Sequence, residues 1–295
     1  MSAAPGGGSI LLRAGHVTRR FGSLTAVEDA TMHVRAGEVV GLLGANGAGK
    51  TTLLRMLLGL LPVTEGTVEL LGGPPDRTRR RRLGYVPQGL GLYRDLTVRE
   101  NIAFSTEAYG ARPPALPSAL EGSAQRQVGT IPLGLQRQLA FVAALAHSPD
   151  VLVLDEPTSG VDPLAGAALW DEIHGQAERG AGVLVTTHNM QEAQQCDRLL
   201  LMSRARLVAQ GSEADVIGTT TAIEVRTGDW AKTFATLDEA GMPVTLFGRA
   251  VRVADADVDA LEALLTGAHI AADLVRVPAT IEERMTVLAR TSQRR

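Results

Sequence analysis

Apolar runs and helix-like segments alternate between about residues 10 and 210 of this chain of 295 residues. The runs at 151–154 and 183–186 are uninterrupted by polar residues, which is typical of strands buried on both faces of a sheet. Runs at 199–202 and 207–209 are separated by a short turn, and this spacing predicts a closing hairpin. The alternation predicts an α/β domain over 10–215.

A second pattern follows between about 220 and 290. Short strand-like runs alternate with amphipathic segments, and their order predicts a small α+β accessory domain without residues that suggest catalysis. The expected strands are 223–226, 244–246, 251–253 and 274–277, and the expected helices are 230–240, 258–265 and 281–289. Residues 1–9 are rich in Gly, Ala and Ser, which predicts a disordered N-terminus.

Composition changes this picture in a few respects. Hydrophobic residues make up 45% of the chain and aromatic residues 3%, so the core must consist mainly of Leu, Val and Ala. A net charge of −3 gives no general attraction for nucleic acid. The single cysteine, Cys196, excludes an internal disulfide and fits a reducing compartment. Because neither a signal peptide nor an apolar run of about 18 residues is present, we expect a membrane role to depend on a partner.

Residues 44–51 fit the phosphate-binding pattern G-x-x-x-x-G-K-[ST], between a predicted strand at 38–43 and a predicted helix at 52–58. Glycines allow the backbone N–H groups of such a loop to face phosphates, and the following helix presents its positive end. Lys50 is expected to reach the outer phosphates, and the Thr51 hydroxyl to bind Mg²⁺. The alternative, a tight glycine turn with a surface lysine, does not account for the flanking strand and helix.

Polar residues at the ends of other strands supply the remaining chemistry. Asp155 and Glu156 follow the run at 151–154, where Asp155 is expected to hold Mg²⁺ through water and Glu156 to act as general base toward water. His188 ends the run at 183–186 on the same side of the predicted sheet, where it is expected to contact the γ-phosphate. Gln88 offers an amide for Mg²⁺ or water. Alternatively, the acidic pair caps a strand on the surface and the histidine is structural.

Taken in this order, these residues resemble the ATP-binding subunit of ABC transporters over about residues 10–215, in particular multidrug-type export ATPases. The resemblance implies a P-loop ABC ATPase core with an antiparallel β subdomain, a helical subdomain, and ATP and Mg²⁺ as cofactors. It assigns Phe21 to adenine stacking, Gln88 to the link with the permease, and His188 to the switch. The resemblance further implies that ATP is bound by Gly44, Asn46, Gly47, Ala48, Gly49, Lys50, Thr51 and Thr52. Mg²⁺ would be held by Thr51, Gln88 and Asp155, and catalysis would depend on Glu156, His188 and Gln88. Residues 159–162, which include Asp162, would form the D-loop.

The chain departs from the family at the signature motif, where Leu-Ser-Gly-Gly-Gln is replaced by residues 131–135, Ile-Pro-Leu-Gly-Leu. The family's serine faces the γ-phosphate held by a partner subunit, but Pro132 has neither a hydroxyl nor an N–H. Gly134 still allows the backbone to approach a phosphate, whereas the side chain of Leu133 is expected to crowd the loop where the family has glycine. Proline is tolerated at the first position of a helix, so a helix is still expected here. A similar proline-containing signature occurs in multidrug-type exporters, and the sequence leaves hydrolysis across this motif open.

Two further features concern the surface. Residues 109–131 are fewer than the family usually has, and the proline-rich stretch 111–117 breaks helix, which predicts a helical subdomain shortened by about one helix. This subdomain contacts the permease in the family. The basic run of Arg77 and residues 79–82 is interpreted as a solvated surface segment, with contact to anionic lipid headgroups as the alternative.

The predicted function is therefore the ATP-hydrolysing subunit of an ABC exporter, which dimerises on ATP and drives a separate integral membrane permease. Export is inferred from family resemblance, including the tail at 278–283. The predicted location is cytoplasmic, at the inner face of the membrane. The alternative is an ATP-binding regulatory half of a heterodimer, with Pro132 as its motivation. Action on ribosomes or DNA would require fused ATPase domains or a long coiled coil, and no nucleic-acid partner is expected.

Overall fold

The computed structural model describes residues 8–291, which form two compact units divided between Val208 and Ala209. Each unit has its own hydrophobic core, and the two are described separately below. The boundaries predicted from sequence, 10–215 and 220–290, stay predictions. The disorder predicted for 1–9 concerns mostly residues outside the described range, and Ser9 accepts a hydrogen bond from the N–H of Ala36.

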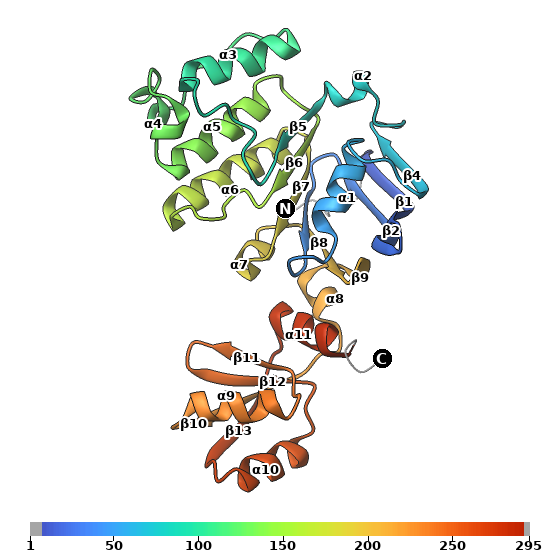
Figure 1. Ribbon diagram of the computed structural model, residues 1–295, viewed down its shortest axis with the longest axis vertical. Helices are drawn as coiled ribbons and strands as arrows, with labels where there is room; N and C mark the ends of the chain where they lie inside the picture. The colour runs from blue at the N-terminus through green and yellow to red at the C-terminus, as the bar shows by residue number, and fades with distance from the viewer. Residues whose placement is uncertain (1–7, 292–295) are drawn as a thin grey trace, which may run out of the picture. The chain divides into compact units, whose positions relative to one another are not determined.

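A six-stranded sheet in the order β5-β6-β7-β3-β8-β9 forms the centre of the first unit (Figure 1). The pairs β5/β6, β6/β7, β7/β3 and β3/β8 are parallel. Every residue of β3, β6 and β7 is buried, as expected of apolar strands covered on both faces. The predicted hairpin is confirmed as β8 and β9. The strands are β3 (Val39–Leu43), β5 (Leu83–Val86), β6 (Val151–Asp155), β7 (Gly182–Thr187), β8 (Arg198–Ser203) and β9 (Arg206–Gly211).

A three-stranded antiparallel sheet in the order β2-β1-β4 confirms the β subdomain that the family resemblance implied. Its strands are β1 (Ile10–Phe21), β2 (Leu24–Arg35) and β4 (Glu65–Leu70). Helix α1 (Lys50–Leu57) contacts all three strands, and its apolar face shares one core with both sheets. This packing fixes the start of α1, and with it the loop at 44–49, against two rigid layers.

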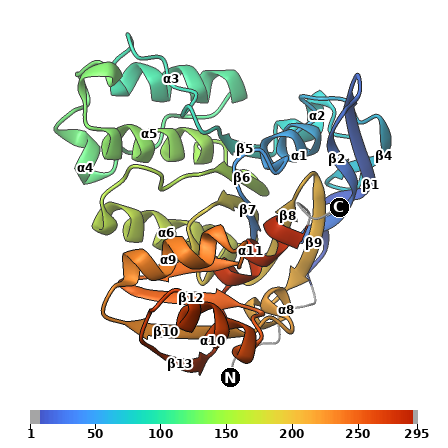
Figure 2. The same ribbon diagram turned by 60° about the horizontal axis from the view of Figure 1, so that its bottom comes forward.

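A helical subdomain lies beside the sheet edge that ends in β5 (Figures 1 and 2). Its small core joins α3 to α5 through residues such as Ile102 and Leu139. A capping box of Thr97 and Glu100 begins α3. Between α3 and α5 the structure has just a four-residue helix and a three-residue 3₁₀ turn, so the shortened subdomain is confirmed. Besides α1, the helices of the unit are α2 (Arg77–Arg80), α3 (Val98–Tyr109), α4 (Ser118–Glu121), η1 (Val128–Thr130), α5 (Leu133–Leu145), α6 (Pro163–Glu178) and α7 (Met190–Ala193).

The second unit is an antiparallel four-stranded sheet in the order β11-β12-β10-β13, built from a β-α-β-β-α-β succession (Figure 2). Val251 and Val253 of β12 face the core formed with two helices, whereas Arg252 between them pairs with Glu283 of the last helix. The predicted α+β succession is confirmed. Its elements are α8 (Glu213–Ile217), β10 (Ala222–Thr227), α9 (Trp230–Glu239), β11 (Val244–Phe247), β12 (Ala250–Ala254), α10 (Val258–Gly267), β13 (Ala272–Val277) and α11 (Ile281–Thr291).

Candidate nucleotide-binding site

A cavity of about 700 Å³ opens in the first unit around the loop that precedes α1. This volume lies in the range of small-molecule and cofactor sites, about 300–1,000 Å³. The cavity is formed by segments far apart in sequence: the β1–β2 turn, the loop before α1, the segment after β5, the end of β6 and the β8–β9 turn. Its lining residues are Phe21, Leu24, Thr25, Ala26, Asn46, Gly47, Gly49, Lys50, Thr51, Thr52, Gln88, Glu156, Arg204 and Ala205.

The loop at 44–49 needs glycine for two separate reasons. Gly44, Gly47 and Gly49 have positive φ angles of 157°, 81° and 108°. A Cβ at Gly49 would lie 2.4 Å from the carbonyl oxygen of Ala26, and one at Gly44 would lie 2.4 Å from that of Met202. The loop backbone is thus closely packed between β2 and the end of β8. This packing fixes the conformation of the loop and the position of the N-terminal end of α1.

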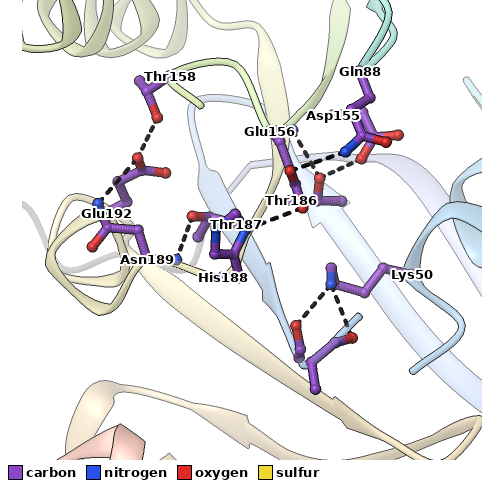
Figure 3. A network of polar contacts seen from close by, with 12 residues as sticks. Lys50, Gln88, Asp155, Glu156, Thr158, Thr186, Thr187, His188, Asn189 and Glu192 are labelled. Atoms are coloured by element: carbon purple, nitrogen blue, oxygen red, sulfur yellow. Dashed lines mark hydrogen bonds and ion pairs between the residues drawn. The ribbon is translucent and has the colours of Figure 1, made fainter. Parts of the chain in front are cut away.

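Lys50 points its amine back into the loop (Figure 3). Nζ donates to the carbonyl oxygens of Gly44 (2.7 Å) and Ala45 (3.2 Å), and the residue is 7% exposed. Burial lowers the pKa of Lys50, while the charges of Glu156 and Asp155 act in the opposite direction. A cation held at a helix N-terminus with backbone N–H groups around it forms an anion site that fits a polyphosphate.

Glu156 stands at the wall of the cavity, immediately after β6 (Figure 3). Gln88 donates from Nε2 to Oε2 of Glu156 (3.2 Å), and Nδ1 of His188 lies 3.1 Å from Oε1. The side chain of Glu156 is 10% exposed and that of His188 is 54% exposed. The three predicted catalytic side chains therefore meet, with the carboxylate at the centre and the histidine at the solvent side.

Asp155 lies deeper, at the carboxyl end of β6, and is 4% exposed. Its Oδ1 accepts a hydrogen bond of 2.6 Å from Oγ1 of Thr186 on the neighbouring β7. Thr51, Gln88 and Asp155 provide hydroxyl, amide and carboxylate oxygens, the ligand types that Mg²⁺ prefers. Thr51 and Gln88 line the same cavity as Lys50, whereas Asp155 lies behind its wall, so Thr51 and Gln88 are the members of the donor set that fit direct contact with the predicted ion.

Phe21 lies at the mouth of the cavity, at the end of β1. Its side chain is 45% exposed, and the guanidinium carbon of Arg19 lies 4.5 Å from the ring centroid. An exposed aromatic face at the edge of a phosphate site suits a planar base. The position fits the adenine-stacking role that the family resemblance gave to Phe21.

The structure gathers most of the predicted residues around the cavity, although six of them do not line it. Asp155 and His188 reach it only through their neighbours Thr186 and Glu156. Gly44 and Ala48 belong to the loop without lining the cavity, and Gly134 and Asp162 lie outside it. A Cβ at Gly134 would be 4.0 Å from Oδ2 of Asp162, so these two are close to one another. Pro132 is the N-cap of α5 rather than its first helical residue, one position earlier than predicted, because its ψ of 149° is extended.

Several contributors to the site were not predicted from the sequence, among them Thr186, the start of β2 at 24–26 and the β8–β9 turn. Thr186 receives the N–H of Glu156 at both its carbonyl and its hydroxyl oxygen, in addition to its bond to Asp155. Arg204 and Ala205 form the two-residue β8–β9 turn with φ angles of 46° and 67°. Ala205 donates its N–H to Ala48 of the loop. Thr186 lies two residues before His188 in the last part of β7, which was a signal in the sequence, whereas nothing local indicated the turn.

The basic run near α2 is held by the protein itself. Arg82 pairs with Asp150 (2.6 Å) and Arg79 with Asp76, while Arg80 and Arg81 donate to the carbonyl oxygens of Gly59 and Tyr109. These contacts favour the interpretation as a surface segment over a lipid contact.

Comparison with known proteins decides the family. The ABC transporter family model matches residues 27–159. Nod factor export ATP-binding protein I of Burkholderia thailandensis is 44% identical over 214 residues, which cover 68% of this chain and 70% of that protein. This chain is a member of the ABC transporter ATP-binding family. A probable multidrug ABC transporter ATP-binding protein, YbhF of Escherichia coli, is 39% identical over 221 residues, 71% of this chain and 38% of that protein.

Solved structures agree with this membership. An ATP-binding subunit of an ABC transporter superposes with a TM-score of 0.64 at 29% identity, covering 70% of this chain and 92% of the other. A dimeric ATP-binding cassette in a post-hydrolysis state bound to ADP and Pi, with a TM-score of 0.59 and 23% identity, shares the fold. As an ABC transporter ATP-binding protein, the chain carries the P-loop ATPase fold predicted from its motifs. Within residues 8–291, no helix combines the length and hydrophobicity that crossing a bilayer requires.

Proposed function

We propose that this chain binds ATP and Mg²⁺ in the P-loop cavity and hydrolyses ATP as the energy-supplying subunit of an ABC exporter. The observation that carries this proposal is the placement of Glu156. Its carboxylate stands in the wall of the same cavity as Lys50 and Thr51 and is held between Gln88 and His188. A carboxylate fixed at a phosphate site is placed to accept a proton from an attacking water.

Each residue then has a defined task. Phe21 stacks on adenine, the loop N–H groups and Lys50 bind the phosphates, and the Thr51 hydroxyl, with Gln88 and Asp155, holds the metal. When bound, Mg²⁺ neutralises charge on the phosphate oxygens. The amide of Gln88 orients one oxygen of Glu156. His188, at the exposed side of the carboxylate, contacts the γ-phosphate and stabilises the charge that develops there.

The partners follow from the family. We propose that two such subunits close on ATP head to tail, that Gly134 and Asp162 serve the site of the partner subunit, and that a separate membrane permease binds the helical subdomain at the inner face of the membrane. The positions of Gly134 and Asp162 near one another but outside the cavity support a role at a second site. The relatives named for multidrug transport and Nod factor export support export.

The proposal is tested by steady-state phosphate release from ATP by the purified chain. Glu156→Gln removes the proton acceptor and keeps the size and the hydrogen-bonding neighbours. We expect this variant to bind ATP as the parent does and to lose hydrolysis by at least about 100-fold, in line with the loss of a general base. Equal rates for the two proteins would contradict the proposal.

A second candidate function is that of a regulatory half, which binds ATP but depends on a different ATPase subunit. It is favoured by Pro132, which caps α5 without any side-chain hydrogen bond, and by Leu133, which is 42% exposed at the start of that helix. ATP binding without hydrolysis by the chain alone, followed by hydrolysis on mixing with a second ATPase subunit, would support this candidate over the first.

A further inference from the structure

A buried arginine joins the helix that begins at the signature position to the backbone of Glu156. Arg137 lies in the second turn of α5, whose N-cap is Pro132. Its Nη1 donates to the carbonyl oxygens of Glu156 (3.0 Å) and Pro157 (3.2 Å). One guanidinium nitrogen therefore ties α5 to two consecutive peptide groups at the point where the chain leaves β6.

Packing alone does not explain an arginine at this place. Arg137 is 8% exposed, and within residues 8–291 its buried Nε has no hydrogen-bond partner. Burial lowers the pKa of Arg137, opposed by the charges of Glu156 and Glu192. A buried N–H without an acceptor is destabilising, and an unbranched apolar side chain would fill similar space without this cost. What an apolar residue cannot supply is the pair of bonds to the two carbonyl oxygens.

The backbone that Arg137 holds is strained. Glu156 has a φ of 52°, a left-handed conformation that is unfavourable for a residue with a side chain. Such a conformation persists when surrounding contacts determine it. The N–H of Glu156 donates to Thr186 on one side, and its carbonyl accepts from Arg137 on the other. Hydrogen bonds to β7 and to α5 therefore hold the backbone of Glu156 from two sides.

We propose that Arg137 is a positioning residue that fixes the backbone of Glu156, and thereby aims its carboxylate into the P-loop cavity. The inference rests on the proposed function in so far as Glu156 is the base of ATP hydrolysis. It also means that a displacement of α5 is transmitted directly to the base. The helix that carries the altered signature thus controls the alignment of the catalytic carboxylate in its own subunit.

The kinetic test compares Arg137→Met with Arg137→Lys. The methionine variant loses both donated bonds, and we expect kcat for ATP hydrolysis to fall by about 10- to 100-fold, the effect of misplacing a catalytic group by about 1 Å. KM for ATP should change by less than about threefold, because the residues that bind the phosphates are untouched. Lysine can still donate to a carbonyl, so Arg137→Lys should recover part of kcat.

Arg198→Met is the matched control. Arg198 is also partly buried and donates to a backbone carbonyl, that of His33, and to the carboxylate of Glu38. It stands at the amino end of β8, whereas Glu156 follows the carboxyl end of β6. This variant should keep the parent kcat. If Arg137→Met has the kcat of Arg198→Met, or if Arg137→Lys is no better than Arg137→Met, the proposal is wrong.

Hydrogen exchange tests the proposal independently of activity. The N–H of Ser159 donates to the carbonyl of Glu156 (3.3 Å), so its exchange reports on that peptide group. In Arg137→Met, and to a smaller degree in Arg137→Lys, the amides of Glu156 and Ser159 should exchange at least about tenfold faster, while those of β3 stay unchanged. Unchanged exchange overturns the positioning role. A parent chain without activity, together with faster exchange in the variants, would instead contradict the proposed function and leave the positioning role standing.

Discussion

At the scale of single residues, the reactive groups of the cavity are held by protein neighbours. The amine of Lys50 donates to two loop carbonyls, the carboxylate of Glu156 contacts Gln88 and His188, and Asp155 accepts from Thr186. Groups fixed in this way need little reorganisation when a substrate binds, which is the condition for electrostatic stabilisation of charge at a phosphate. The arrangement also explains why single side chains are expected to have large effects.

Replacement of Lys50 by alanine tests the phosphate site. The variant loses a charge-assisted contact worth about 1.5–3 kcal/mol, so the Kd for ATP should rise by about 10- to 100-fold. Equilibrium binding of a fluorescent ATP analogue measures this. Arg55→Ala removes an exposed positive charge from the last turn of the same helix and serves as control. Equal affinities of the two variants would contradict the role of Lys50.

Cys196 provides a prediction that depends on pH. Burial raises the pKa of its thiol to about 12, with the charges of Asp197 and Glu192 acting in the same direction. The folded chain thus keeps a proton that the unfolded chain releases above about pH 8.5, and stability should fall as the pH rises through this interval. At pH 8, iodoacetamide should modify Cys196 in urea but hardly in the native protein. Rapid native modification would contradict a partly buried thiol that stays protonated.

At the scale of elements, the P-loop depends on its contacts with two sheets. Gly49 precedes α1 and lies against Ala26 of β2, while Gly44 lies against Met202 of β8. Ala205, in the turn after β8, donates its N–H to the carbonyl oxygen of Ala48. The loop is therefore an integral part of the fold, and substitutions in it should affect stability as well as nucleotide binding.

Two glycines of this loop form a matched pair. A Cβ at Gly47 would meet no atom within 4 Å, so Gly47→Ala should destabilise through its left-handed φ alone, by about 1–2 kcal/mol. Gly49→Ala adds a clash at 2.4 Å with a backbone oxygen, and we expect about 1–3 kcal/mol more. Urea unfolding of both variants measures the difference. Equal losses of unfolding free energy would show that the clash is relieved without cost.

Local pattern was sufficient for the strands and for most of the site. The buried strands β6 and β7 are apolar along most of their length, so the sequence pattern predicted them. Glu156 and His188, which follow these strands, matched recognisable sequence motifs. Arg137, Thr186 and Arg204 were not predicted, because their roles arise where segments distant in sequence meet. The position of Pro132 also differed by one residue, since its extended ψ places it before the helix.

At the scale of the whole molecule, each unit has its own core, and residues of the first unit line the nucleotide cavity. Completion of the ATP site is proposed to require a second subunit. Assembly then depends on how Pro132 and Leu133 face the γ-phosphate of the partner subunit, where the family has Ser and Gly.

Solution mass tests this directly. Glu156→Gln prevents turnover, so with Mg²⁺ and ATP we expect light scattering to show a shift from one chain, 31.1 kDa, to twice that mass. Pro132→Ser restores a hydroxyl and an N–H at the signature and should strengthen dimerisation of the same variant. A mass of one chain for Glu156→Gln, with a dimer in the Pro132→Ser background, would indicate that the natural signature needs a different partner.

The most direct test of the central claim is the identity of the nucleotide that the protein retains after incubation with radiolabelled ATP and Mg²⁺. We predict that the parent chain holds ADP, because Glu156 has activated water, and that Glu156→Gln holds intact ATP at equal occupancy. ADP in both proteins would contradict the assignment of Glu156 as the base, and absence of bound nucleotide from both would contradict the P-loop cavity as an ATP site.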